Sequence, residues 1–204
     1  MPNLIFDFDG VLADTYEVTK GTQTKMNVGN SEAFIDFDEY IIKKPNHTKN
    51  HTLTTEEMKK LVSRVNEFGT FVHQSGFVLF DDFVQEIKKL KVTNQAVVSS
   101  GSQIYILPAL AKSGLELTHV LAFEDHHSKE EKIELICRDW GIEVSETYYF
   151  TDTLADVYEL QNFIHPDKLI GVAWGYCSKE QLLTELKPEN ILNSPADLPK
   201  LLAR

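Results

Sequence analysis

Two carboxylates stand one residue apart at the end of an apolar run near the amino terminus. Asp7 and Asp9 follow the run from Leu4 to Phe6, with Phe8 between them. Such a run is typical of a buried strand in a parallel sheet, and these sheets bind ligands at the carboxyl ends of their strands. Because side chains alternate along a strand, both acids point to the same side. Two anions this close require a cation, so the pair predicts a cation site.

A hydroxyl and a lysine follow two later apolar runs. Ser99 ends the first run, and Ser100 and Gly101 lead directly into a helix whose first N–H groups can bind an anion. Lys129 stands at the start of another helix, where the helix dipole disfavours a cation, and this favours a functional reason for its position. Lys132 is the alternative lysine, on a different face of the same helix.

Two further acids, Asp152 and Asp156, end another apolar run and are one helical turn apart. Each feature also has an ordinary interpretation: Ser99 as a helix cap, Lys129 as a solvated side chain, and the two acids as partners of a helix dipole. Together they form a more specific set. Carboxylates that can hold a divalent cation, a hydroxyl, a lysine and helix N-termini make a site for a phosphoryl group.

The elements that must position these residues alternate from Gln95 onward. Apolar strand runs at residues 96–98, 120–123, 148–150 and 169–173 are separated by helical patterns, which predicts a parallel sheet with right-handed crossovers. Residues that cap helix starts or end helices support the assignment. They are Ser128, Ser178 and Ser194 at starts, and Gly114 and Gly141 at ends.

An insertion interrupts this alternation after the first strand. Three helices are predicted in it, over residues 31–42, 54–68 and 81–90, with a polar loop at 43–52. The second helix begins at Thr54, which forms a capping box with Glu57. From about Tyr16 to about Phe80 the chain is expected to form a small helical module whose aromatic residues make its own core. We place the insertion at residues 16–90, within a core domain of residues 1–15 and 91–204.

The composition excludes several classes of protein. A formal net charge of -11 argues against binding to nucleic acid or an anionic membrane surface, both of which attract basic faces. The sequence has no secretory signal and no apolar stretch approaching the ~18 residues of a membrane span. The sequence has only two cysteines, Cys137 and Cys177, and such a low number is typical of proteins in a reducing compartment. We therefore expect a cytoplasmic protein.

The order of these motifs resembles the haloacid dehalogenase superfamily of Mg²⁺-dependent phosphotransferases. Asp7-Phe8-Asp9-Gly10-Val11, then Ser99, then Lys129, then Asp152 with Asp156 is similar to its four motifs. The resemblance implies an α/β, Rossmann-like doubly wound parallel sheet with an inserted small α-helical cap. The tail from Gly171 to Pro195 is similar to the end of phosphoglycolate phosphatase-like members.

The resemblance also implies roles for the acids. Asp7 would be the nucleophile that becomes an aspartyl-phosphate, and Asp9 would protonate the leaving oxygen and then activate water. Mg²⁺ would be held by Asp7, the backbone carbonyl of Asp9 and Asp152, with Asp156 acting through water or from further out.

The remaining motif residues would neutralise the phosphoryl oxygens. Lys129, Ser99 and the N–H groups of Phe8, Ser100 and Gly101 could share this work, because phosphoryl transfer depends mainly on alignment and charge neutralisation. The implied function is a Mg²⁺-dependent phosphatase acting on a small phosphorylated metabolite. A sugar phosphomutase of the β-phosphoglucomutase type and a phospho-receiver or inactive binding module are the alternatives.

Two positions leave questions for the structure. Thr151 stands where many relatives have Gly before the fourth-motif Asp, and it could either crowd the metal approach or add a hydroxyl. Substrate selection would come from the cap, with the loop from Lys43 to Lys49 and His51 as candidates beside the interpretation that this loop is merely solvated. The substrate and the oligomeric state are not predicted.

Overall fold

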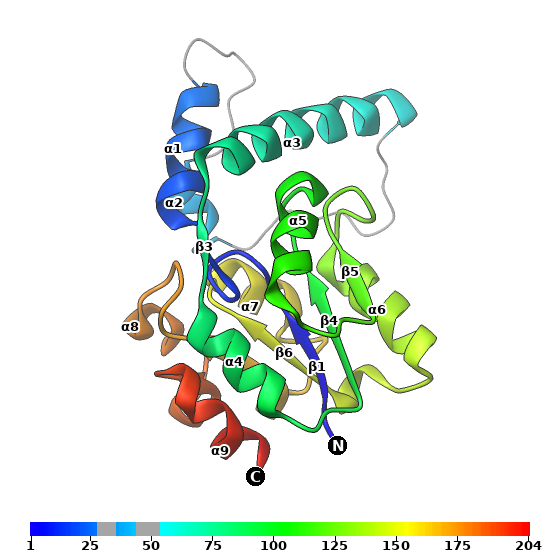
Figure 1. Cartoon of the computed structure of the whole chain (residues 1–204), viewed down its shortest axis with the longest axis vertical. Helices are drawn as coiled ribbons and strands as arrows, with labels where there is room; N and C mark the ends of the chain where they lie inside the picture. Colours follow the sequence, from blue (N-terminus) through cyan, green and yellow to red (C-terminus); the bar gives the residue numbers. More distant parts are fainter. Residues whose placement is uncertain (28–35, 44–53) are drawn as a thin grey trace.

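The computed structural model describes residues 1–27, 36–43 and 54–204 (Figure 1). A six-stranded sheet has the order β5-β4-β1-β6-β7-β8, and all neighbouring strands are parallel. The strands are β1 Asn3–Phe6, β4 Asn94–Val98, β5 His119–Leu121, β6 Thr147–Thr151, β7 Leu169–Val172 and β8 Ile191–Leu192. The parallel α/β fold predicted from the alternating runs is confirmed, and the sequence analysis missed only the two-residue β8 in this sheet.

The register of the central strand explains why the motif residues meet. Phe6 of β1 pairs with Val97 of β4 on one side and with Phe150 of β6 on the other. The residues that follow these three strands therefore emerge at the same edge of the sheet. Asp7, Ser99 and Asp152 all lie within two residues of these pairs, although they are far apart in the sequence.

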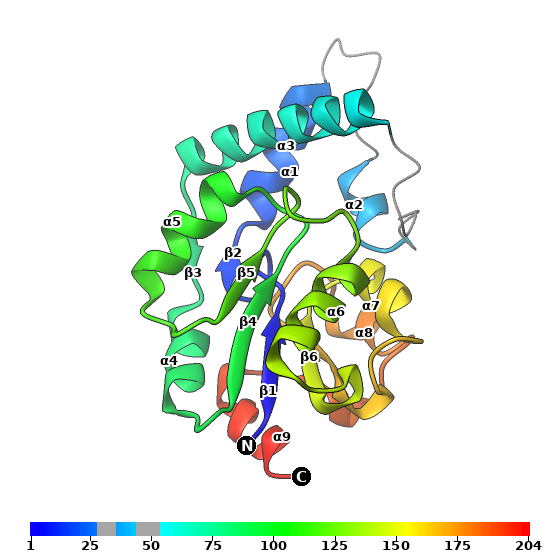
Figure 2. The same cartoon turned by 90° about the vertical axis from the view of Figure 1, so that its right-hand side faces the viewer.

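Helices cover both faces of the sheet (Figure 2). Leu4 and Phe6 pack with residues of α4, α5 and α9 on one face, and Ile5 packs with residues of α6, α7 and α8 on the other, as alternation along a strand requires. The helices of the core are α4 Asp81–Lys89, α5 Gln103–Ser113, α6 Lys129–Trp140, α7 Leu154–Leu160, α8 Lys179–Leu182 and α9 Leu198–Leu202. Short 3-10 turns are η1 Val144–Glu146, η2 Pro166–Lys168, η3 Pro188–Asn190 and η4 Pro195–Asp197.

The insertion is a helical layer over the carboxyl edge of the sheet (Figure 1). Its described helices are α1 Tyr16–Asn27, α2 Phe37–Tyr40 and α3 Thr55–Ser75. A short antiparallel pair that the sequence analysis missed, β2 Ala13–Asp14 with β3 Val78–Leu79, joins the two points where the chain leaves and re-enters the core. Because α4 packs on η4 and α9 of the core, we propose that the cap ends near residue 80 and not at residue 90.

Most local predictions agree with the structure. The Thr54–Glu57 capping box opens α3, Ser128 and Ser178 cap α6 and α8, and Ser194 precedes η4. Gly114 and Gly141 end α5 and α6 in the left-handed conformation. Of the helix predicted at residues 31–42, the described part holds α2. The predicted loop from Lys44 onward, with His51, lies outside the described residues.

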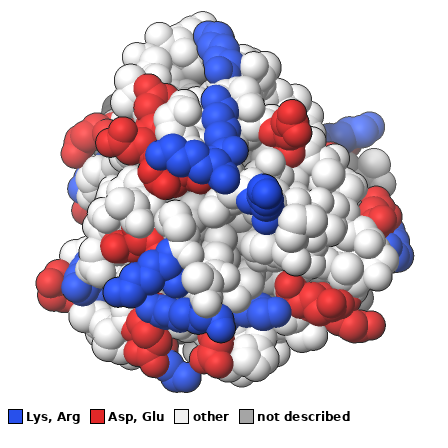
Figure 3. Space-filling model, turned by 60° about the horizontal axis from the view of Figure 1, so that its bottom comes forward, with Lys and Arg blue, Asp and Glu red and all other residues white. Residues whose placement is uncertain are grey.

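The surface carries charges of both signs. On the face shown in Figure 3, Lys and Arg side chains form short groups bordered by Asp and Glu. Exposed ion pairs of the chain include Lys187 with Asp167, and such pairs contribute little to stability. Cys137 and Cys177 are buried free thiols. Among the described helices, none is both long and apolar enough to span a membrane.

Candidate active site

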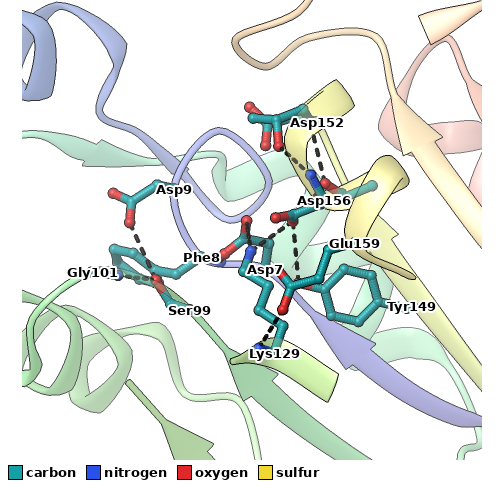
Figure 4. A network of polar contacts seen from close by, with 12 residues as sticks. Asp7, Phe8, Asp9, Ser99, Gly101, Lys129, Tyr149, Asp152, Asp156 and Glu159 are labelled. Atoms are coloured by element: carbon teal, nitrogen blue, oxygen red, sulfur yellow. Dashed lines mark hydrogen bonds and ion pairs between the residues drawn. The ribbon is translucent and has the colours of Figure 1, made fainter. Parts of the chain in front are cut away.

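Asp7 and Asp9 lie in the turn that follows β1 (Figure 4). The Asp7 side chain turns toward α6 and α7, whereas the Asp9 side chain turns toward α5. Asp7 is 6% exposed. The two acids therefore border one site from different directions, each with its own set of partners.

Lys129 joins two of the carboxylates. Its Nζ lies 2.7 Å from Oδ2 of Asp7 and 2.6 Å from Oδ2 of Asp156, and its side chain is 3% exposed. Burial disfavours the charged ammonium, but the Asp156 and Asp7 carboxylates outweigh it and raise the pKa of Lys129 well above its usual value. Burial and the neighbouring acids raise the pKa of Asp7, although Lys129 opposes them.

Of the two acids that contact Lys129, Asp156 is more strongly stabilised as an anion than Asp7. Burial opposes its charge, yet Lys129 and the hydroxyl of Thr151 lower its pKa. Thr151 Oγ1 donates to Asp156 Oδ2 at 2.8 Å, and Tyr149 Oη donates to the same oxygen at 3.3 Å. Thr151 thus adds a hydroxyl that fixes Asp156, which answers the question raised by its departure from Gly.

The two candidate lysines have different positions in the structure. Lys129 contacts the carboxylates, and Glu159 accepts a hydrogen bond from its backbone N–H at 2.8 Å, at the start of α6. Lys132 is also fully buried, and its Nζ donates to the carbonyl of Ser99 at 2.5 Å. The two lysines therefore reach the same site from one helix, and Lys129 is the one in contact with Asp7.

Asp9 is held by hydroxyl groups. Tyr105 Oη donates to its Oδ2 at 2.7 Å, Thr15 Oγ1 donates to its Oδ1 at 2.8 Å, and Ser99 Oγ lies 3.4 Å from Oδ2. Burial raises the pKa of Asp9, and the Tyr105 and Thr15 hydrogen bonds oppose this rise. Tyr176 supports the arrangement, because its hydroxyl lies 2.6 Å from Thr15 Oγ1.

Asp152 is completely buried between two glycines. Its Oδ2 accepts a hydrogen bond from the Tyr176 N–H at 2.7 Å, while its Oδ1 is a buried oxygen without a hydrogen-bond partner. A Cβ on Gly10 would lie 1.8 Å from Asp152 Oδ2, and one on Gly175 would lie 2.2 Å from its Cβ. Burial raises the pKa of Asp152 to about 8. At neutral pH this carboxyl is therefore mostly protonated, and a cation placed nearby would favour its ionised form.

The residues present fit a Mg²⁺ site that also uses main-chain and water oxygens. Asp152 Oδ1 has no hydrogen-bond partner, and the buried acids Asp7, Asp152 and Asp156 outnumber the ammonium of Lys129 that contacts them. Both observations favour a bound hard cation. Mg²⁺ suits the site because it binds carboxylates and keeps several of its waters. Over the described ranges, no three acid, histidine or cysteine side chains already converge as a complete metal site. Asp7 and Asp152 would hold the ion, while Asp156 is engaged with Lys129.

Two of the three predicted phosphate-binding N–H groups already have partners. Phe8 N–H donates to Oδ1 of Asp7 at 2.7 Å, and Gly101 N–H donates to Ser99 Oγ at 2.9 Å. These bonds shape the turns after β1 and β4. Ser100 lines a cavity of about 310 Å³ that extends from Asp9 toward the cap. The three groups lie at the site, and their binding of phosphate stays a prediction.

Four residues of this network were not found by sequence reasoning. They are Thr15, Tyr105, Glu159 and Tyr176, from four different elements or turns. The side chains of Thr15, Tyr105 and Glu159 bond to motif residues, whereas Tyr176 bonds to Thr15 through its hydroxyl and to Asp152 through its backbone N–H. Their positions follow no spacing pattern relative to the motifs. A hydroxyl residue on the first turn of the helix after Ser99 is the one local signal that could have indicated Tyr105.

Comparisons with known proteins identify a matching family and similar folds. The model of the haloacid dehalogenase-like hydrolase family matches residues 4–162. No curated protein sequence matches the chain. Among solved structures, a predicted phosphatase from Clostridium acetobutylicum is 18% identical with a TM-score of 0.68, and the match covers 100% of this chain and 99% of that one.

Two other solved structures have the same fold at similar identity. A predicted phosphoglycolate phosphatase from Haemophilus somnus is 15% identical with a TM-score of 0.69, over 99% of this chain and 98% of that one. A variant of CbbY from Rhodobacter sphaeroides in complex with xylulose-(1,5)bisphosphate is 16% identical with a TM-score of 0.65, over 97% and 96%. These likenesses extend over the cap as well as the core.

Proposed function

This chain belongs to the haloacid dehalogenase-like hydrolase family, and from that premise we propose that it is a Mg²⁺-dependent phosphatase of small phosphomonoesters. The observation that carries the proposal is the buried contact of Lys129 with Asp7, directly beside Asp9 and Asp152. A nucleophile, a proton donor, a cation and a metal-binding acid occur together in this arrangement. The names of the phosphatases with the same fold support the proposal.

In the first step, a carboxylate oxygen of Asp7 attacks phosphorus and the bond to the alcohol oxygen breaks. The leaving oxygen takes the proton of Asp9, whose raised pKa favours the protonated form needed for this task. Lys129 neutralises charge beside Asp7 and orients that carboxylate. The products of the step are the free alcohol and an aspartyl-phosphate on Asp7.

In the second step, the now ionised Asp9 takes a proton from water, and the resulting hydroxide attacks phosphorus. The bond between phosphorus and the Asp7 oxygen breaks, releasing inorganic phosphate and restoring both acids. Tyr105 and Thr15 hold Asp9 in place during both proton transfers. When bound, Mg²⁺ supplies charge neutralisation for the phosphoryl oxygens.

The test is phosphate release from phosphorylated metabolites with Mg²⁺ or with excess chelator. We expect turnover that requires Mg²⁺ and is abolished in Asp7→Asn, because an amide cannot form the acyl-phosphate. Asp14→Asn is the matched control, since Asp14 is an exposed acid on β2, and it should keep wild-type activity. Wild-type-like turnover in Asp7→Asn would refute the mechanism, and isomerised sugar phosphate without free phosphate would favour the phosphomutase alternative.

A further inference from the structure

The cavity beside Asp9 has mainly carbon-rich walls. Six aromatic side chains line its volume of about 310 Å³, from both the cap and the core. They are Phe37, Tyr40, Phe68, Tyr105, Phe123 and Tyr176. The ring centroids of Phe37 and Tyr176 lie 5.5 Å apart at 58°. This volume equals that of about ten water molecules, and a two-carbon acid such as glycolate would leave most of it filled by water.

One face of α3 provides the apolar side of the cavity. Leu61, Arg64, Val65 and Phe68 line it at helical spacing. The helix is held against the core by close contact, because a Cβ on Gly69 would lie 2.5 Å from the Cβ of Ser102. Phe37 and Phe68, which were expected to be core residues of the insertion, pack into hydrophobic clusters and also line this cavity.

The polar groups in the walls are largely engaged with one another. The Tyr105 hydroxyl is bonded to Asp9, and the Tyr176 hydroxyl lies within hydrogen-bond distance of Thr15 and of Thr19. Gln23, Arg64 and His127 also have interactions within the chain. A polyhydroxylated sugar would need a partner for each hydroxyl that it buries, whereas a flat apolar group needs only surface contact and ring stacking.

We propose that the substrate is a phosphomonoester of an aromatic or heteroaromatic alcohol, with the ring in this cavity and the phosphoryl group at Asp7. This inference rests on the proposed phosphatase function and goes beyond it by naming the leaving group. Phe68 and Val65 are specificity-determining residues, because both line this cavity with apolar side chains and neither belongs to the motif set.

The first experiment compares substrates that all leave as primary alcohols, so that leaving-group chemistry does not decide the outcome. We expect kcat/KM for 2-phenylethyl phosphate to exceed that for phosphoglycolate, glycerol 3-phosphate and glucose 6-phosphate by at least about tenfold. Preference for phosphoglycolate or a sugar phosphate, with Mg²⁺-dependent turnover intact, would overturn the inference and leave the phosphatase proposal standing.

Variants on α3 locate the preference. Phe68→Ala should lower the ratio of kcat/KM for 2-phenylethyl phosphate to that for phosphoglycolate about tenfold. Val65→Thr, of the same volume, should lower it in the same direction. Phe71→Ala is the control, since Phe71 lies on the same helix and contacts the Lys25 ammonium, 4.3 Å from its ring centroid. An equal fall of this kcat/KM ratio in Phe71→Ala would overturn the assignment of Phe68 as a specificity-determining residue.

A binding measurement separates the two proposals. The phosphonates 3-phenylpropylphosphonate and 3-phosphonopropionate copy the two substrates but cannot be hydrolysed, and calorimetry with the full chain and Mg²⁺ gives their affinities. We expect the phenyl compound to bind at least about tenfold more tightly. Tighter binding without hydrolysis of any phosphate ester would refute only the phosphatase function, and equal or weaker binding of the phenyl compound would refute the aromatic pocket.

Discussion

The ammonium of Lys129 lies 2.7 Å from a carboxylate oxygen of Asp7, and both side chains are more than nine-tenths buried. The same ammonium contacts Asp156, so one buried cation is shared by two acids whose side chains are each 8% exposed. Removing one member of a buried ion pair leaves its partner's charge uncompensated. The stability of the core is therefore coupled at this contact to the proposed nucleophile, Asp7.

Lys129→Met should lower the free energy of unfolding by about 3 to 5 kcal/mol, because Asp7 and Asp156 lose their common cation. Urea denaturation at neutral pH measures the change. Lys187→Met is the control, since the pair of Lys187 with Asp167 is exposed and its loss should leave the free energy of unfolding nearly unchanged. Equal losses in the two variants would show that the buried contact carries no special stability.

Gly10→Ala should destabilise the chain and abolish turnover, because the new methyl group would overlap Asp152 Oδ2. Gly141→Ala is a matched control, since Gly141 has φ 67° against 71° for Gly10 but nothing within 4 Å of the added Cβ. Both variants pay about 1 to 2 kcal/mol for the left-handed backbone. Thermal denaturation measures the stability of each variant, and phosphate release measures its activity. Equal losses in Gly10→Ala and Gly141→Ala would contradict the predicted overlap with Asp152.

Lys132 should make stability increase with pH above neutrality. Burial and the neighbouring Lys129 lower its folded-state pKa from 10.5 to about 7, so between these pH values the unfolded chain binds more protons than the folded one. The contribution of Lys132 to the free energy of unfolding should then rise with pH, by up to about 1.4 kcal/mol per pH unit. Urea denaturation of wild type and Lys132→Met at pH 7.5 to 9.5 should show a smaller slope in the variant, and identical slopes would contradict the shift.

Tyr105→Phe should lower kcat about tenfold with little change in KM, because a hydrogen bond to a charged group contributes about 1.5 to 3 kcal/mol and Tyr105 positions Asp9. Tyr16→Phe is the control, since the Tyr16 hydroxyl donates to the exposed Asp38 and should leave both constants unchanged. Steady-state kinetics over substrate concentrations from below to above KM gives both constants for each variant. A change confined to KM would show that Tyr105 acts only in the cavity wall.

The sheet was largely predictable because its strands are buried on both faces. Continuous apolar runs such as the one before Asp7 have few other interpretations, and the capping boxes at Thr54 and Ser178 are local signals. The strands β2, β3 and β8 were missed because each has only two residues, too few to show a periodic pattern. The cap boundary depends on tertiary packing of α4, which its amphipathic sequence does not specify.

The site was predictable where chemistry and strand ends coincide. The proximity of Asp7, Ser99 and Asp152 could be predicted because the carboxyl ends of parallel strands lie at the same edge of a sheet. Tyr105 and Tyr176 could not, since their roles arise from contacts with Asp9 and Thr15 across about half or more of the chain. The burial of Lys132 was also unpredicted, because a lysine on a separate helical face is usually solvated.

The place of β1 in the sheet has a consequence during synthesis. Asn3 pairs with Asn94 and with Thr147, so β1 is synthesised before both of its neighbours in the sheet. At about 5 to 20 residues per second, on the order of ten seconds separate the synthesis of β1 from that of β6. The carboxyl edge of the sheet, where Asp7, Ser99 and Asp152 lie, can therefore form only late in translation.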